Sequence, residues 1–119
     1  MALVHTDLVT FDVPEPDASA RFWCTALAAE VTEREDEGRW VVVSGGAVHG
    51  RLGFQRGEVR PGGVHLDLSC AASDLEAEVE RLVAAGATLL RPVRREAYGA
   101  IANMACPDGH AFDICAYDA

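Results

Sequence analysis

Short apolar runs, many of them rich in β-branched residues, predict most of the secondary structure of this chain. Two of these runs, residues 5–13 and 63–69, are each followed by a helical apolar stripe and then by three further strand-like runs. The predicted helices cover residues 17–27 and 73–85. The other predicted strands are 29–34, 39–44, 50–55, 87–91, 98–105 and 110–116. The pattern therefore predicts an α+β fold in which the order βαβββ occurs twice.

The second predicted helix has the clearer end signals. Ser73 and Glu76 have the spacing of a capping box at its start, and Gly86 is placed as a stop at its end. Its predicted buried stripe consists of Leu75, Val79, Leu82 and Val83.

The two halves of the chain also match in register. At an offset of 55 residues, Asp12 falls on Asp67, and both follow apolar strand residues. Identities between the halves are few, so the repeat rests mainly on the order of elements. We expect a single domain over residues 1–119, built from two modules of about residues 1–58 and 59–119.

Composition narrows the range of partners and compartments. The chain has 19 acidic and 10 basic side chains and a formal charge of −9, which argues against nucleic acid or an anionic membrane as partner. Neither a long apolar run nor a signal-peptide pattern is visible, so we expect a cytoplasmic protein. The four cysteines form no C-x-x-C pair and are expected to be reduced thiols.

Two predicted strands place polar residues on one face of an apolar run. In "GVHLDLSC", alternation gives His65, Asp67 and Ser69 a common face. In the last predicted strand, Asp113 and Cys115 share a face in the same way. Polar groups on one face of an otherwise apolar strand are typical of the wall of a ligand cavity.

Three segments carry a resemblance to a known family: "TFDVPEPDASARFWCTAL", "FQRGEVRPGGVHLDLSCAASDLEAEVERLVAAGA" and "CPDGHAFDIC". They resemble the vicinal oxygen chelate superfamily of glyoxalase and bleomycin-resistance proteins, and most of all its small glyoxalase-like domain proteins. The resemblance implies that each βαβββ module forms a curved sheet with its helix outside. Two modules, from one chain or two, would be related by an approximate two-fold axis and close a concave cavity. The superfamily includes isomerases, lyases, dioxygenases and drug binders.

The resemblance also implies candidate metal ligands, because metal-dependent members take one ligand from the first and fourth strand of each module. His65 and Asp113 fall on these positions in the second module, where they would suit a divalent metal such as Zn, Fe, Ni or Mn. The first module offers Leu8 or Thr10, neither of which is a usual metal ligand, and Gln55, which could bind only weakly through oxygen. His5 has the opposite strand parity and would need a bulge to face inward.

Several roles remain open for these residues. His65 and Asp67 could form a pair in the cavity wall, or His65 could act in acid–base catalysis without metal. Alternatively, His65 and Asp113 could bind a metal whose coordination is completed by Gln55, water or substrate. The aromatic side chains of Trp40 and Tyr98 either stack on a flat ligand or pack in the core. The basic run "RPVRRE" favours a solvated loop, with capture of an acidic ligand group as the alternative. The candidate ligand-binding residues are Thr10, Asp12, Trp40, Gln55, Tyr98 and Cys115.

Two functions from different classes remain. The first is a glyoxalase-like enzyme of lyase or isomerase type that acts on a small oxygen-rich metabolite. The second is a protein of the bleomycin-resistance type that sequesters an antibiotic or metabolite without catalysis. A homodimer is expected in either case, because modules of roughly 60 residues bury little surface alone and relatives usually pair their modules.

Overall fold

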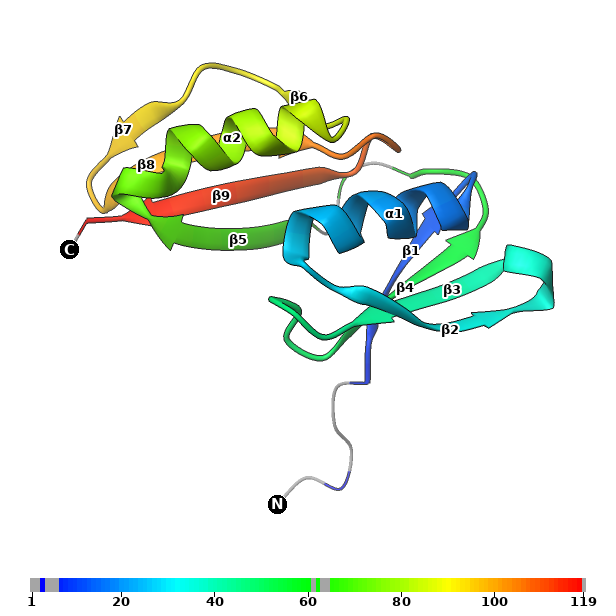
Figure 1. Ribbon diagram of the computed structural model, residues 1–119. Coiled ribbons are helices and arrows are strands. Elements are labelled where there is room, and N and C mark those ends of the chain that lie inside the picture. Colours follow the sequence, from blue (N-terminus) through cyan, green and yellow to red (C-terminus); the bar gives the residue numbers. More distant parts are fainter. Residues whose placement is uncertain (1–2, 4–6, 61, 63–64, 119) are drawn as a thin grey trace. The chain divides into compact units, whose positions relative to one another are not determined.

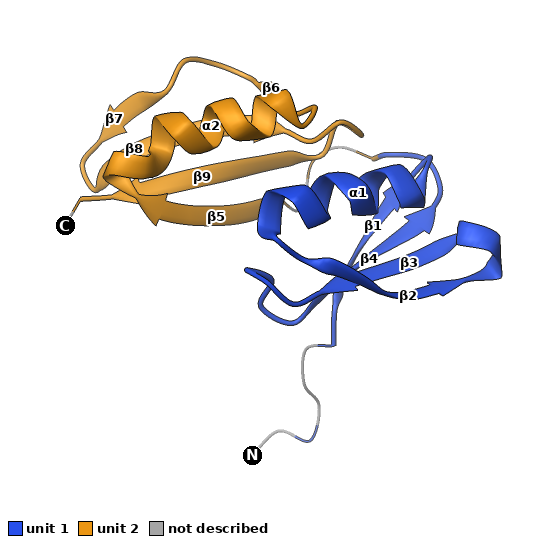
Figure 2. Cartoon of the chain, in the orientation of Figure 1, with its two compact units in different colours: residues 1–59 blue, residues 60–119 orange. Residues whose placement is uncertain are grey.

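The computed structural model describes residues 3, 7–60, 62 and 65–118. The chain divides into two compact units, residues 1–59 and residues 60–119 (Figure 2). Each unit is a mixed sheet with one α-helix packed on one face (Figure 1).

The first unit has a four-stranded sheet in the order β1-β4-β3-β2. β1 and β4 are parallel, and the other neighbours are antiparallel. A 3-10 turn at Asp36–Gly38 joins β2 to β3. The other elements are β1 (Val9–Val13), α1 (Pro16–Leu27), β2 (Glu30–Glu35), β3 (Trp40–Ser44) and β4 (Arg51–Arg56).

The second unit repeats this arrangement in the order β5-β9-β8-β6, with β7 also paired to β8. β5 and β9 are parallel, as β1 and β4 are in the first unit. The predicted α+β class and the repeated βαβββ order are therefore confirmed, with one strand added. The elements are β5 (Leu66–Ala71), α2 (Leu75–Ala84), β6 (Thr88–Leu89), β7 (Arg94–Glu96), β8 (Gly99–Ala105) and β9 (Ala111–Tyr117).

The predicted strand 87–91 is wrong in extent. Only Thr88–Leu89 pair with β8, and a separate strand, β7, forms within the run that was predicted as a solvated loop. Pro92 cannot donate to a strand ladder, which explains why the edge strand is interrupted at this point. Two predicted strand starts, at residues 5 and 63, lie outside the described residues.

Helix α1 and the first sheet share an aromatic core. Pro16 occupies the first helical turn, where its missing N–H leaves no backbone bond unmade. The ring centroids of Phe11 lie 6.5 Å from those of Trp23 and 5.9 Å from those of Phe54, with nearly parallel planes. All three side chains are buried. The helix is therefore fixed to the sheet by large apolar contacts at its centre.

The predicted capping box of α2 is wrong in position. Ala72–Asp74 form a 3-10 turn, so α2 begins at Leu75 with Asp74 as N-cap, one residue after the predicted cap Ser73, and the cap makes no side-chain hydrogen bond. The predicted stop is confirmed, because Gly86 has φ +115° and its N–H donates to the Val83 carbonyl at 3.0 Å. Val83 was predicted to be buried with the stripe, but it is 45% exposed.

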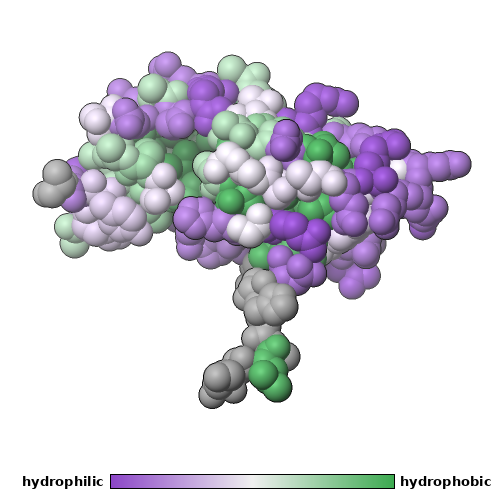
Figure 3. Space-filling model, turned by 60° about the horizontal axis from the view of Figure 1, so that its bottom comes forward, coloured by the Kyte–Doolittle hydropathy of each residue, from purple (hydrophilic) through white to green (hydrophobic). Residues whose placement is uncertain are grey.

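The charge of the first unit gathers at the β2–β3 end of its sheet. β2 and the turn that follows it are rich in exposed Glu, Asp and Arg. Hydrophilic side chains dominate the corresponding right-hand part of Figure 3. β2 is an edge strand, and a register shift between Val31 and Glu33 makes it irregular.

All four cysteines are free thiols. Among the described residues, neither α1 nor α2 has the length and apolar character that a membrane span requires.

The loop after β3 closes onto the end of α1. The Ala47 N–H donates to the Leu27 carbonyl at 2.7 Å. A Cβ added at Gly46 would lie 2.0 Å from the Ala28 carbonyl oxygen, whereas a Cβ at Gly45 would meet nothing within 4 Å. Both glycines have positive φ, at +55° and +82°. Of these two glycines, only Gly46 therefore combines this backbone with a contact that excludes any side chain.

We expect Gly46→Ala to destabilise the first unit far more than Gly45→Ala. A left-handed alanine costs about 1–2 kcal/mol at either position. At Gly46 the clash with backbone oxygen should bring the total to about 3 kcal/mol or more. Urea unfolding followed by tryptophan fluorescence measures this, since the chain's two tryptophans, Trp23 and Trp40, both belong to this unit. Equal losses in the two variants would contradict the packing described above.

Candidate functional site

A row of polar side chains crosses the open face of the second sheet, opposite α2. The register places Asp67 of β5 beside Asp113 of β9, and Asp113 beside Asn103 of β8. The residues that alternate with Asp113 on β9, Phe112 and Ile114, are buried. Strand alternation therefore separates an apolar helix-facing side from a polar open side.

His65 directly precedes β5 and joins this row. Its Nε2 atom lies 3.3 Å from Asp67 Oδ1 and 3.5 Å from Asp113 Oδ2. One donor atom of each residue lies within 4.8 Å of the others. The side chains of His65, Asp67 and Asp113 are 50%, 64% and 20% exposed. The structure thus brings together three residues that the sequence placed on one face, in a cluster that solvent reaches.

Asn103 supports the cluster from β8 and was not singled out in the sequence. Its Nδ2 atom donates to Asp113 Oδ1 at 2.7 Å. Its Oδ1 atom accepts from Arg91 Nε at 3.1 Å and from Arg94 Nη1. The sequence does contain one indication of its role, because Asn103 is a polar amide inside the apolar run "GAIANMA". The arginines could not be placed, because their position depends on the interruption between β6 and β7.

Cys115 and Tyr98 lie further along the same sheet. Cys115 follows Asp113 on the open face and stands beside Ser69 in the register. Tyr98 packs on Tyr117 with ring centroids 5.6 Å apart. Partial burial raises the pKa of the Tyr98 hydroxyl. The electrostatic influence of Cys115 and then of Glu96 raises this pKa further. This end of the face is therefore aromatic, whereas the His65 end is charged.

The first unit has a corresponding row with different chemistry. Its register places Asp12 beside Gln55 and Gln55 beside Trp40. Gln55 Nε2 donates to Asp12 Oδ1 at 3.2 Å, and Trp40 Nε1 donates to Glu33 Oε2 at 3.1 Å. Thr10 is exposed on the same strand as Asp12. Within the described part of the chain, the only group of three or more His, Cys, Asp and Glu side chains placed to hold a metal is the one in the second unit.

Trp40 and Gln55 line a cavity of about 320 Å³ together with Asp36, Arg39 and Arg56. The indole lies over Gly53, since a Cβ added there would be 2.6 Å from Trp40 Cη2. The indole ring can occupy this position because Gly53 has no side chain. The half-buried ring forms a flat wall of the cavity.

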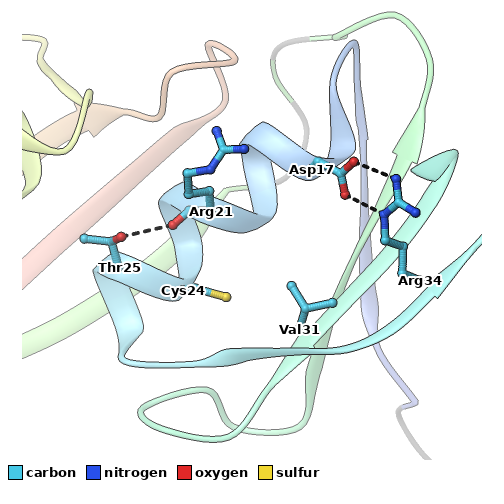
Figure 4. A pocket seen from close by; sticks show the side chains of 6 residues that line it. All are labelled: Asp17, Arg21, Cys24, Thr25, Val31 and Arg34. Carbon is cyan, nitrogen blue, oxygen red and sulfur yellow. Dashed lines mark hydrogen bonds and ion pairs between the residues drawn. The ribbon is translucent and has the colours of Figure 1, made fainter. Parts of the chain in front are cut away.

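Another cavity, of about 620 Å³, opens between α1 and β2 in the first unit (Figure 4). Asp17 accepts hydrogen bonds from Arg34 Nε and Nη2, both at 3.0 Å, and these bonds hold the pKa of Asp17 below its usual value. Burial raises the pKa of the Cys24 thiol, and the negative charge of Glu30 makes a smaller contribution in the same direction. With its carboxylate engaged and its thiol protonated, this cavity lacks an activated catalytic group.

Comparisons with known proteins agree with the fold. The structure of a glyoxalase-related enzyme from Fulvimarina pelagi is similar over 98% of this chain and 89% of that chain, with TM-score 0.76 and 24% identity. A glyoxalase/bleomycin resistance protein/dioxygenase family enzyme from Burkholderia phytofirmans PsJN matches at TM-score 0.77 and 18% identity, covering 92% of this chain and 97% of that one.

A third similar structure is that of a mutant of the fosfomycin resistance protein FosX from Listeria monocytogenes, in complex with Mn(II) and 1S,2S-dihydroxypropylphosphonic acid. It matches at TM-score 0.79 and 16% identity, covering 98% of this chain and 92% of that one. Identities this low show the common fold alone. No curated protein matches the chain.

The family comparison covers nearly the whole sequence. The model of the Glyoxalase-like domain matches residues 8–115, a range that includes both units, from β1 to most of β9. The chain therefore belongs to the glyoxalase-like domain family of the vicinal oxygen chelate superfamily.

Proposed function

We propose that this protein binds, and with a bound cation transforms, a small oxygen-rich metabolite on the open face of its second sheet. The observation that carries the proposal is the cluster of His65, Asp67 and Asp113, whose donor atoms lie within 4.8 Å of one another. Family membership supports a small-molecule ligand. Trp40 and Gln55, which line a cavity of the first unit, are proposed to bind a ligand there. We expect the protein to act in the cytoplasm.

The cluster fits a divalent cation. One imidazole nitrogen and two carboxylate oxygens suit Zn, Fe, Ni or Mn. Two donors bound to one such ion lie about 3.0–3.5 Å apart, since each bond is about 2.1 Å long. The His65 nitrogen lies 3.3 and 3.5 Å from the two carboxylate oxygens. A cation held here would polarise an oxygen of the ligand.

The same cluster supports a weak rather than a tight metal site. The sequence predicted two metal ligands in the second module, His65 and Asp113. The structure adds Asp67 as a third side chain whose donor atom lies within reach. However, the side chains of His65 and Asp67 are at least half exposed, so water competes for them. Within the described residues, Asn103 is the hydrogen-bond donor that orients Asp113. Oxygen atoms of the ligand would complete the coordination.

His65 has a role in ligand binding with or without metal. Its imidazole stands between two carboxylates that fix its orientation. It can donate to a ligand oxygen, bind the cation, or transfer a proton. The last two roles belong to a lyase or isomerase reaction.

Sequestration of an antibiotic or metabolite without catalysis is the second candidate function. It is favoured by the first unit, whose corresponding row offers Asp12, Gln55 and Trp40 in place of a second set of metal ligands. An amide, a carboxylate and a flat indole are suited to orient and stack a ligand.

We expect weak divalent metal binding that depends on this cluster. Titration of Mn(II), monitored by electron paramagnetic resonance, should show a single site that His65→Ala and Asp67→Asn each weaken about tenfold or more. His49→Ala is the matched control, because His49 is an exposed loop histidine of the first unit. A His65→Ala variant that bound Mn(II) like the unaltered protein would refute the site. Tight, near-stoichiometric metal in the purified protein would instead favour the enzyme over the sequestering protein.

We also expect a homodimer. Each unit covers one face of its sheet with a helix of its own, and units of roughly 60 residues bury little surface. Light scattering coupled to gel filtration should give about twice the chain mass of 12.7 kDa. A strict monomer at micromolar concentration would contradict this expectation.

A further inference from the structure

Two arginines of the second unit converge on one neutral oxygen. Asn103 Oδ1 accepts from Arg91 Nε at 3.1 Å and from Arg94 Nη1. The other end of the amide is committed to Asp113 at 2.7 Å, which fixes the orientation of the amide. Two positive groups therefore meet at an atom that carries no negative charge.

The charge of this pair is only partly balanced. Arg94 Nε lies 3.1 Å from Glu96 Oε1. For Arg91, Asn103 is the hydrogen-bond partner recorded among the described residues, and no carboxylate pairs with it there. The neighbouring Arg95, by contrast, has a two-pronged pair with Asp118 at 3.1 and 2.6 Å. Like charges held close together favour an anion between them.

The backbone path brings these two arginines together. Leu90 N–H donates to the Asn103 carbonyl at 2.8 Å, and Arg94 pairs with Ile101 two residues back along β8. More residues thus lie on the outer strand than on β8 over this stretch, so the chain around Pro92 bulges. The bulge directs Arg91 and Arg94 to the same amide.

We propose that Arg91 and Arg94, held by Asn103, bind an oxyanion group of the ligand: a carboxylate, a phosphonate or a phosphate. Each planar guanidinium offers a fork of N–H donors that matches such a group. This inference rests on the proposed function, because it assigns the anionic end of the same small molecule. Asp113 and Asn103 are neighbours on adjacent strands, about 5 Å apart. The ligand is therefore compact, with its oxygen donors at His65 and its anion one strand further along.

The experiment uses the full chain in the presence of a chelator, so that it is independent of any metal site. Methylphosphonate, inorganic phosphate and glycolate are titrated separately at low, constant ionic strength. NMR follows the side-chain amide of Asn103 and the arginine Nε–H signals. We expect saturable shifts at Asn103, Arg91 and Arg94. Tighter binding of methylphosphonate than of glycolate assigns a phosphonate or phosphate ligand, and the reverse order assigns a carboxylate.

Variants separate the subsite from general charge attraction. Arg91→Gln should weaken binding of the preferred probe about tenfold or more, as the loss of a charge-assisted contact predicts. Arg95→Gln, which removes the same charge from the β7 residue next to Arg94, should leave it unchanged, because Arg95 is paired with Asp118. His65→Ala should lose metal but retain anion binding, so a failure of the metal site is distinguishable from a failure of this one. Equal weakening by Arg91→Gln and Arg95→Gln, or equal shifts with chloride, would overturn the proposal.

Discussion

The parallel pairing of β5 with β9 is the constraint on which the site depends. Residues alternate between the two faces of a strand, so the burial of Phe112 and Ile114 on one face sends Asp113 to the other. A slip of one residue would bury Asp113 and expose the two apolar side chains, at the cost of desolvating a carboxylate. Apolar packing beneath α2 therefore holds the charged cluster in place.

How much of this could be predicted depends on the range of the interactions involved. The common face of His65 and Asp67 follows from strand alternation, which is a local property visible in "GVHLDLSC". The Asn103 network depends on how β6 and β7 pair with β8, and pairing between distant segments has no local signature. The start of α2 was misplaced for a related reason. Ser73 has the residue pattern of a cap, but the chain continues β5 into a 3-10 turn before the helix begins.

The two units show how one backbone plan supports different chemistry. Asp67, Asp113 and Asn103 occupy one row of the second sheet. The equivalent row of the first sheet holds Asp12, Gln55 and Trp40. The register is the same, yet the first row has an indole and an amide where the second has an amide and a carboxylate. The family fold thus fixes where side chains stand, and the individual residues decide what they can bind.

The interrupted outer edges of both sheets affect how the protein behaves at high concentration. A long, regular edge strand is a template for strands of other molecules and so promotes aggregation. β2 is broken by its register shift between Val31 and Glu33 and carries many charges. The outer strand of the second sheet is divided at Pro92 and flanked by arginines. The bulge that brings Arg91 and Arg94 to one amide thus also removes a surface on which insoluble β-structure could grow.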